Sequence, residues 1–351
     1  MRCLLHAGVL AALLVYGLSA CSSADADAVA DFYHGKTIRL IVGSAAGGGY
    51  DIVGRLVATR LGAHIPGNPA VVVENMAGAG GLVMANTLYN SAPRDGTAIG
   101  LPTNAVPLEP RLKLLTRNGG TAGFDIGQFG WLGSAARQPQ VLYVWHEVPV
   151  RTAAELKTTP VLMGTLGVGT DSYTLPLVMN EVMGAKMKVV PGYVGESDTL
   201  VALERGEIQG NSAGLANLLS AEPEWLRDGK VRILIQFGRE RLPELPDVPA
   251  APELAGDDID RDMLRFFALK YDMAYTLITP PGVPLERLAA LRIAFDATMQ
   301  DPEYIAAAKK ISLPVNPLSG DDVTKLVALI QDAPQNVVDR MRSILDKASQ
   351  K

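Results

Sequence analysis

The segment Thr37-Ile-Arg-Leu-Ile-Val-Gly-Ser-Ala-Ala-Gly-Gly-Gly-Tyr-Asp-Ile-Val53 decides the fold class. A β-branched apolar run stops at a cluster of small residues, and an amphipathic pattern begins directly after it. This order predicts a strand over 37–43, a glycine-rich turn and a helix over 51–63. A turn without bulky side chains leaves backbone N–H groups accessible at a helix N-terminus, where the helix dipole is positive. The segment can therefore hold an anion without a basic side chain.

Small-residue turns follow other predicted strands as well. Asn75-Met-Ala-Gly-Ala-Gly-Gly81 follows a strand over 70–74, and Leu166-Gly-Val-Gly-Thr-Asp-Ser172 follows a strand over 161–165. Strands that alternate with helices predict an α/β fold with mainly parallel sheets and ligand sites at the carboxyl ends of the strands. A single glycine-rich turn can simply be a tight connection whose glycines adopt positive φ. Several such turns at one edge of a sheet instead favour a binding site.

Other parts of the chain carry less regular patterns. Residues 116–130 are rich in glycine and polar residues, which predicts an irregular segment. Glu207–Gly210 is predicted as a strand that leads through Asn211-Ser-Ala-Gly into a helix over 214–220. Proline-rich loops are predicted after a strand over 231–236, and a helix over 320–347 is predicted near the end of the chain.

The residues argue against three classes of enzyme. Gly210-Asn-Ser-Ala-Gly214 fits the G-x-S-x-G elbow of hydrolases, which need an acid and then a histidine after the serine. All four histidines precede Ser212. The first glycine turn lacks the G-x-G-x-x-G spacing of a dinucleotide site, and the histidines are too scattered for a metal site. We therefore expect no catalysis, no cofactor and no metal.

The N-terminus predicts secretion. Residues 1–20 combine an early Arg2 with a short apolar run, which is typical of a signal peptide. The run ends in Leu18-Ser-Ala-Cys21, which resembles a lipobox, and this resemblance implies cleavage before Cys21 and attachment of lipid to its sulfur. Ser22 in place of an aspartate is compatible with the outer membrane. The alternative is an ordinary signal peptide followed by a chance cysteine. Residues 21–32 are predicted to be a flexible tether.

Composition excludes several other functions. The formal net charge is −5 and the chain has no basic run, which argues against nucleic-acid binding. The two cysteines are Cys3 and Cys21. Removal of the signal peptide and lipidation of Cys21 would leave no thiol for a disulfide, a metal ligand or a nucleophile.

A series of short motifs carries a family resemblance. They begin with Ile38-Arg-Leu-Ile-Val, Gly48-Gly-Tyr-Asp51 and Val72-Val-Glu-Asn-Met-Ala-Gly-Ala-Gly-Gly81. They continue with Ala92-Pro-Arg-Asp-Gly, Pro191-Gly-Tyr-Val-Gly, Leu203-Glu-Arg-Gly-Glu-Ile-Gln-Gly, Leu245-Pro-Asp-Val-Pro and Thr279-Pro-Pro-Gly-Val-Pro. In this order the motifs resemble the substrate-binding proteins of tripartite tricarboxylate transporters, the Bug family. Two positions depart from the family pattern: Ala77 stands where proline is usual, and Asn211-Ser212 where an aspartate is frequent.

The resemblance implies a periplasmic binding protein of type II, with two α/β lobes that close on a ligand in the cleft between them. Lobe one is expected to comprise 33–139 plus 273–351, and lobe two 140–272, with chain crossings near 138–142 and 268–276.

The resemblance also implies where the ligand lies. The first turn would supply main-chain donors, Ser44 a hydroxyl and Asn104 a further donor or acceptor, while Asp51 would order the helix start. Thr170, Ser172 and Ser197 are the expected donors of lobe two, and the tyrosines beside the turns could stack on a ligand or pack between loop and helix. The predicted ligand-binding residues are Ser44, Ala46, Gly47, Gly48, Tyr50, Asp51, Asn104, Gly169, Thr170, Ser172, Tyr193 and Ser197, with Tyr173 as a further neighbour.

The function that the resemblance implies is capture of a small organic carboxylate, which is aliphatic or aromatic, and its delivery to membrane transporter subunits. The protein is expected to be a lipid-anchored periplasmic monomer. The alternative is the same fold acting as a ligand sensor for a membrane kinase, and a secreted hydrolase is a second alternative.

Overall fold

The structure is a computed structural model that describes residues 27–113, 116 and 121–349. The predicted signal peptide and Cys21 lie outside the described residues. Residues 27–33 form a helix, which includes residues 27–32 of the expected tether. Val29 and Tyr33 of this helix are buried in the core of the first lobe, and this packing holds the helix against the lobe.

The first lobe is built on a mixed sheet with the order β11-β4-β10-β3-β1-β2. Strand β1 (Thr37–Val42) pairs in parallel with β2 (Ala70–Asn75) and β3 (Ala98–Leu101). Strand β10 (Thr276–Thr279) pairs antiparallel with β3 and with β4 (Gly130–Ser134), and β11 (Leu318–Ser319) pairs antiparallel with β4. The carboxyl ends of the three parallel strands β3, β1 and β2 therefore lie side by side at one end of the sheet.

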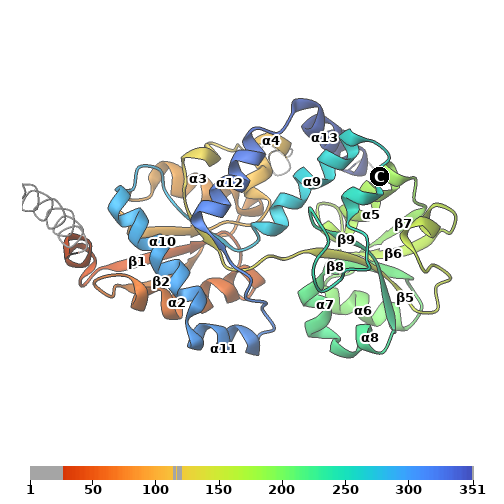
Figure 1. Cartoon of the computed structure of the whole chain (residues 1–351), viewed down its shortest axis with the longest axis horizontal. Coiled ribbons are helices and arrows are strands. Elements are labelled where there is room, and N and C mark those ends of the chain that lie inside the picture. Colours follow the sequence, from red (N-terminus) through yellow and green to blue (C-terminus); the bar gives the residue numbers. More distant parts are fainter. Residues whose placement is uncertain (1–26, 114–115, 117–120, 350–351) are drawn as a thin grey trace, which may run out of the picture.

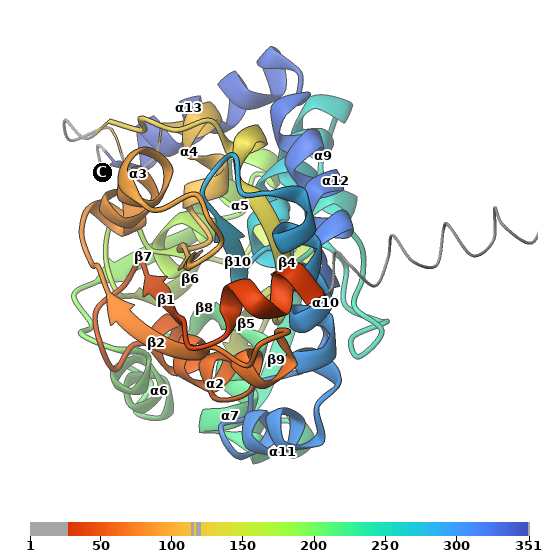
Figure 2. The same cartoon turned by 90° about the vertical axis from the view of Figure 1, so that its left-hand side faces the viewer.

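Helices cover both faces of this sheet. Helix α2 (Gly49–His64) and α10 (Leu285–Gln300) pack on one face, with α11 (Pro302–Lys310) against α2. Helix α3 (Leu82–Ser91) and α12 (Gly320–Gln331) pack on the other face. Figure 2 shows α3 above and α2 below the strands β1 and β2.

The second lobe has a mixed sheet with the order β7-β6-β8-β5-β9. Its strands are β5 (Gln140–Trp145), β6 (Val161–Thr165), β7 (Met187–Pro191), β8 (Gly210–Gly214) and β9 (Val231–Phe237). Strand β6 is parallel to β7 and β8, whereas β5 is antiparallel to β8 and β9. The helices of this lobe are α5 (Asp171–Met183), α6 (Glu196–Glu204), α7 (Leu215–Ala221) and α8 (Pro223–Arg227).

Two helices join the lobes, and the first of them is part of the second chain crossing. Helix α9 (Asp258–Asp272) leads from the second lobe to β10, and α13 (Gln335–Ser349) follows α12 and packs on α9 and α5. A short helix of the first lobe, α4 (Glu109–Leu112), also contacts α13. Figure 1 shows α9 and α13 along the top of the molecule, between the two lobes. One buried cluster of apolar side chains runs from the first lobe through these helices into the second.

The fold class is confirmed as two-lobe α/β, while the sheets are mixed where mainly parallel sheets were expected. Strand β10 reaches the first sheet only after the chain has passed through the second lobe, and β5 enters the second sheet directly after the first crossing. Both strands lie antiparallel to their neighbours. The lobe boundaries at 139/140 and 272/273 stay a prediction. Of the helices that the structure describes, none combines the length and the hydrophobicity that a bilayer crossing requires.

Several predicted elements were wrong in detail. The end of the irregular segment 116–130 forms the start of β4, the helix expected over 320–347 is broken between α12 and α13, and α9 was not predicted. The strand expected over 207–210 instead covers Gly210–Gly214. It is displaced because Asn211 and Ser212, which are typical of turns, are buried in the sheet, where Asn211 donates to Thr199 of the adjacent helix and Ser212 to the carbonyl of Val141 in β5.

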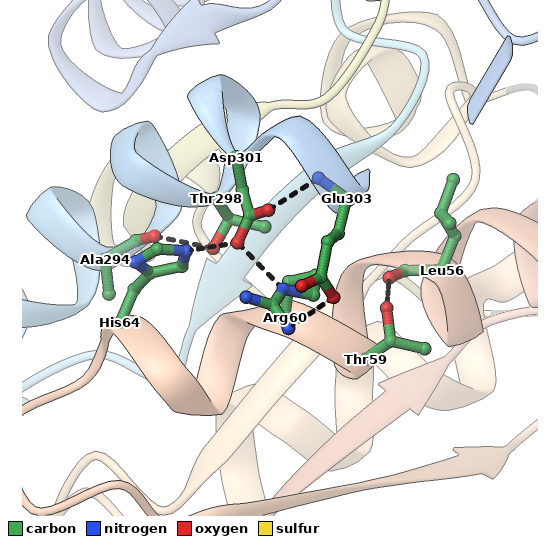
Figure 3. A network of polar contacts seen from close by, with 8 residues as sticks. All are labelled: Leu56, Thr59, Arg60, His64, Ala294, Thr298, Asp301 and Glu303. Atoms are coloured by element: carbon green, nitrogen blue, oxygen red, sulfur yellow. Dashed lines mark hydrogen bonds and ion pairs between the residues drawn. The ribbon is translucent and has the colours of Figure 1, made fainter. Parts of the chain in front are cut away.

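A polar network fixes α2 to α10 and α11 (Figure 3). Asp301, the N-cap residue of α11, is buried and accepts a bond from the backbone N–H of Glu303. Its other oxygen lies 2.7 Å from Arg60 Nε and 2.8 Å from His64 Nε2, on two turns of α2. The hydrogen bond from Arg60 is the main cause that holds the pKa of Asp301 well below its usual value of 3.8, and the bond from His64 adds to it.

We expect Asp301 to make folding stability sensitive to acid. A carboxyl whose pKa is depressed in the folded state stabilises the protein above its unfolded pKa, and this contribution is lost as pH falls below about 4. The Asp301→Asn variant should therefore unfold at lower temperature than the wild type at pH 7, and the difference should shrink between pH 4 and pH 2. Calorimetry across this range checks it. Asp321→Asn removes an exposed carboxylate paired with Arg292 and should show neither effect.

Candidate functional site

The first glycine turn is held in place by Asp51, a buried carboxylate in the first turn of α2. Its oxygens accept bonds from the backbone N–H of Gly47 at 2.8 Å, from Asn75 Nδ2 at 2.9 Å and from Arg55 Nε at 3.1 Å. The bond from Arg55 contributes most to lowering the pKa of Asp51 to about 2, followed by the bond from Gly47. Asp51 is thus ionised and fully engaged by its own chain.

Asn75 extends this network to the second strand. Its amide donates to the carbonyl of Ser44 at 3.2 Å as well as to Asp51, and its oxygen accepts from Arg55 at 3.1 Å. The predicted residues Ser44, Gly47 and Asp51 are therefore brought together through a residue at the end of β2. This agrees with the sequence-based interpretation of Asp51 as a part of the helix start.

Backbone donors remain at the start of α2. Gly48 precedes the helix in an extended conformation, and no side chain caps the helix there. The residues from Ala45 to Gly49, which include Ala46, are exposed. Gly47 has φ of +81°, a conformation that glycine adopts without strain. First-turn N–H groups lack partners inside a helix, so this exposed terminus can bind an anion.

Tyr50 connects this turn to a neighbouring strand end and to the chain crossing. Its hydroxyl accepts a bond from the backbone N–H of Asn104 at 2.8 Å, and its ring lies 5.1 Å from that of Tyr275. Asn104 thus uses its main chain here, where a side-chain role was expected. Tyr275, directly before β10, was missed from the sequence because nothing local distinguishes it from a core tyrosine.

In the second lobe, the turn before α5 is closed by its own hydroxyl groups. Thr170 caps the helix through Tyr173 N–H, and its hydroxyl donates to the carbonyl of Gly167 at 2.7 Å. Ser172 Oγ lies 3.0 Å from Thr170 Oγ1 and accepts from the N–H of Leu166. Gly169 has φ of +91° and is exposed. The two expected donors are therefore adjacent, and both already make local bonds.

Tyr173 does not face a cleft. Its ring is buried, and its hydroxyl donates to the carbonyl of Ala348 in α13 at 3.2 Å. The packing interpretation of this tyrosine is the correct one.

An ion pair between a buried lysine and a half-buried aspartate lies beneath the start of α5. Lys270 of α9 is only 6% exposed, and its Nζ lies 2.5 Å from Asp171. The ammonium group also lies over the rings of Phe267 and Tyr271, at 4.2 and 5.0 Å from their centroids. Burial raises the pKa of Tyr271 well above its usual value, and the neighbouring Asp171 adds to the shift. This pair was not predicted, since its residues are far apart in the sequence.

A second carboxylate stands at the start of α6. Glu196 accepts bonds from Asn217 of α7 at 3.1 and 3.3 Å, and burial raises its pKa. Of the predicted residues here, Ser197 is exposed and Tyr193 is half-buried against the core of the second lobe. No basic side chain pairs with Glu196 in the part of the chain that the structure describes.

The turns of the two lobes act on each other electrostatically. Burial is the main cause that raises the pKa of Tyr50, and Asp171 of the opposite lobe raises it further. The pKa of Tyr275 is likewise raised by burial first and by Glu196 of the opposite lobe to a smaller extent. A pocket of about 230 Å³ opens between the lobes, lined by Gly49 and Tyr275 on one side and Asn217 on the other.

The predicted ligand-binding residues therefore form three local groups: the first around Asp51 and Tyr50, the second around Thr170 and Ser172, and the third around Tyr193 and Ser197. Whether they bind a ligand together stays a prediction. The G-x-S-x-G segment is a buried strand in which Ser212 Oγ donates to the carbonyl of Val141, so this hydroxyl is not presented as a nucleophile. Among the described residues, no group of histidine, cysteine and acidic side chains could hold a metal ion.

The arrangement is that of a two-lobe solute-binding protein, and the solved structures that resemble it share this fold. A solute-binding protein from Polaromonas, solved with no ligand, covers 89% of this chain and 98% of its own at a TM-score of 0.67 and 20% identity. Two Rhodopseudomonas palustris proteins, one with adipate and one with bound malate, give TM-scores of 0.57 and 0.53 at 22% and 21% identity. They cover 90% and 88% of this chain, and 97% and 99% of their own.

Sequence similarity defines the family to which the chain belongs. The family described as "Tripartite tricarboxylate transporter family receptor" matches residues 53–347, and the protein belongs to this family. A curated relative, the UPF0065 protein in the gbd 5′ region of Cupriavidus necator, is 27% identical over 325 residues, which are 88% of this chain and 87% of the relative.

We expect that removing one partner of the Lys270–Asp171 ion pair destabilises the fold more than removing both. Lys270→Met leaves a carboxylate without its cation at a largely buried position, and the free energy of unfolding should fall by about 3 kcal/mol. Adding Asp171→Asn should recover much of this loss, and denaturant unfolding of the double-mutant cycle measures the coupling. Lys325→Met, which removes an exposed lysine paired with Asp322, should change stability by less than about 1 kcal/mol. Equal losses at Lys270 and Lys325 would contradict this interpretation.

Proposed function

We propose that this protein captures a small organic carboxylate outside the cytoplasm and delivers it to the membrane subunits of a tripartite tricarboxylate-type transporter. The observation that carries the proposal is the uncapped start of α2. The one carboxylate in its first turn, Asp51, is already bound by Gly47, Asn75 and Arg55, so exposed N–H groups remain for the anion of a ligand.

Family membership and the ligand-bound neighbours support this proposal. The description of the family names its members as receptors of tripartite tricarboxylate transporters. Two solved structures of the same fold contain the dicarboxylates adipate and malate. Neutral main-chain donors hold an anion with a smaller desolvation cost than a buried guanidinium, which suits a protein that must release its ligand. The carboxylates Asp171 and Glu196 on the opposite lobe favour a ligand that also carries a hydrogen-bond donor, such as a hydroxyl group.

A thermal-shift screen of the purified protein against carboxylates tests the function. The panel contains malate, citrate, adipate, benzoate and phthalate. A ligand at a hundred times its dissociation constant should stabilise the protein by about 2.7 kcal/mol, which raises the melting temperature by several degrees. No shift with any member of such a panel would count against carboxylate capture.

Gly47→Val tests the location of the anion site. Valine at positive φ is strained by about 1–2 kcal/mol, and the variant should lose ligand binding because the turn cannot keep its shape. Gly229→Val is the matched control. Gly229 also has positive φ, 69°, and both glycines have open space where a Cβ would stand. The two variants should lose similar stability, and only Gly47→Val should lose the ligand-induced shift; retained binding would exclude this turn.

We propose in addition that Cys21 carries a lipid that anchors the protein to a membrane, as its lipobox-like sequence suggests. The Cys21→Ser variant, expressed in the source bacterium, should move from the membrane fraction to the soluble periplasmic fraction with unchanged ligand affinity. A variant that still sediments with membranes would refute the anchor.

A further inference from the structure

A groove of about 640 Å³ lies beside the chain crossing, next to the candidate site but outside its turns. One wall comes from α7 of the second lobe. The other comes from α11 and residues 312–316 of the first lobe. No residue of the turns at 43–51, 166–172 and 191–197 lines it. Its volume lies in the range of small-molecule sites.

Apolar side chains on both walls are left exposed to water. Leu219 of α7 is 39% exposed and Ile305 of α11 is 42% exposed. Leu242 and Leu313, which are half-buried, add further apolar surface. Large apolar side chains gathered in one concave surface mark an interaction site, because a binding partner removes them from water.

The charged groups of the groove favour an anion. Arg137 of the crossing segment and Lys309 of α11 line it, against the single acidic residue Glu244. In the part of the chain that the structure describes, the side chains of Arg137 and Lys309 make no ion pair. The groove thus combines an apolar surface with a net positive charge.

The floor of the groove is fixed to both walls. The backbone N–H of Arg137 donates to Asn316 Oδ1 of the first lobe at 2.7 Å. The N–H of Leu215 in the second lobe donates to the carbonyl of Pro139 at 3.0 Å. The groove is continuous with the smaller pocket at Gly49 but does not contain the donors of the candidate site. The residues that line both are Arg137, Ala216, Ser220, Ser312, Leu313 and Pro314.

We propose that this groove is a second binding site, which takes a carboxylate with an apolar chain. The carboxylate pairs with Arg137 or Lys309, and the chain packs between Leu219 and Ile305.

Titration calorimetry of the full chain with octanoate tests the proposal. We expect saturable binding of one octanoate. Butyrate, which is four methylenes shorter, should bind about a hundredfold more weakly or worse, since each buried methylene contributes about fourfold. Octylamine, which has the same chain and the opposite charge, should not displace octanoate.

Variants locate the octanoate. Arg137→Gln with Lys309→Gln should weaken octanoate binding by about tenfold, and Leu219→Asn with Ile305→Asn should weaken it at least as much. Arg205→Gln with Lys188→Gln removes the same charge from other exposed positions and should leave the affinity unchanged.

Three results would overturn the proposal. Unchanged octanoate affinity in both groove variants would exclude the groove. Loss of octanoate binding in Gly47→Val, with the groove variants unaffected, would place octanoate in the candidate site. A change from dimer to monomer in the Leu219→Asn, Ile305→Asn variant, measured by analytical ultracentrifugation without octanoate, would assign the surface to a second copy of the chain.

Discussion

A helix start can bind an external anion only if the carboxylates of its own chain leave its N–H groups free. In this protein Asp51 stands in the first turn of α2, where it could compete with a ligand for those groups. Arg55, Asn75 and the N–H of Gly47 instead engage both of its oxygens, and the same bonds fix the turn between β1 and α2 to the end of β2. One ionised side chain thus shapes the turn and leaves the helix terminus accessible.

In the second lobe, the carboxylates at the helix starts have different partners. Asp171 begins α5, and its charge is balanced from beneath by Lys270 of α9, a helix that connects the lobes. Glu196, at the start of α6, has an amide partner in Asn217, and burial raises its pKa. The two lobes therefore differ in electrostatic character, with main-chain donors on the first and carboxylates on the second. A ligand with an acidic end and a donor group at the other end matches this polarity.

The sequence predicts those strands and turns that depend on interactions between neighbouring residues. Strands rich in β-branched residues, such as Thr37–Val42 and Val161–Thr165, and the turns after them could be read directly. The exact strand Gly210–Gly214 could not be predicted, because the bonds of Asn211 to Thr199 and of Ser212 to Val141, which satisfy these buried polar side chains, come from distant segments. The role of Asp51 was predictable from its position in the first turn. Asn217, Tyr275 and Lys270 enter the site from distant segments, and no spacing along the chain indicates such meetings.

The position of β10 has a consequence for how the chain acquires its fold. Strand β10 fills the centre of the first sheet, between β3 and β4, although the whole second sheet precedes it in the sequence. During synthesis the first lobe therefore lacks its central strand until residue 279 has emerged, and α13, which packs on α5, emerges later still. Contacts between such distant segments form slowly, since their loop-closure entropy is lost before they stabilise anything. A nascent chain with this topology stays incompletely folded for most of its synthesis, which is the condition that export in an unfolded state requires.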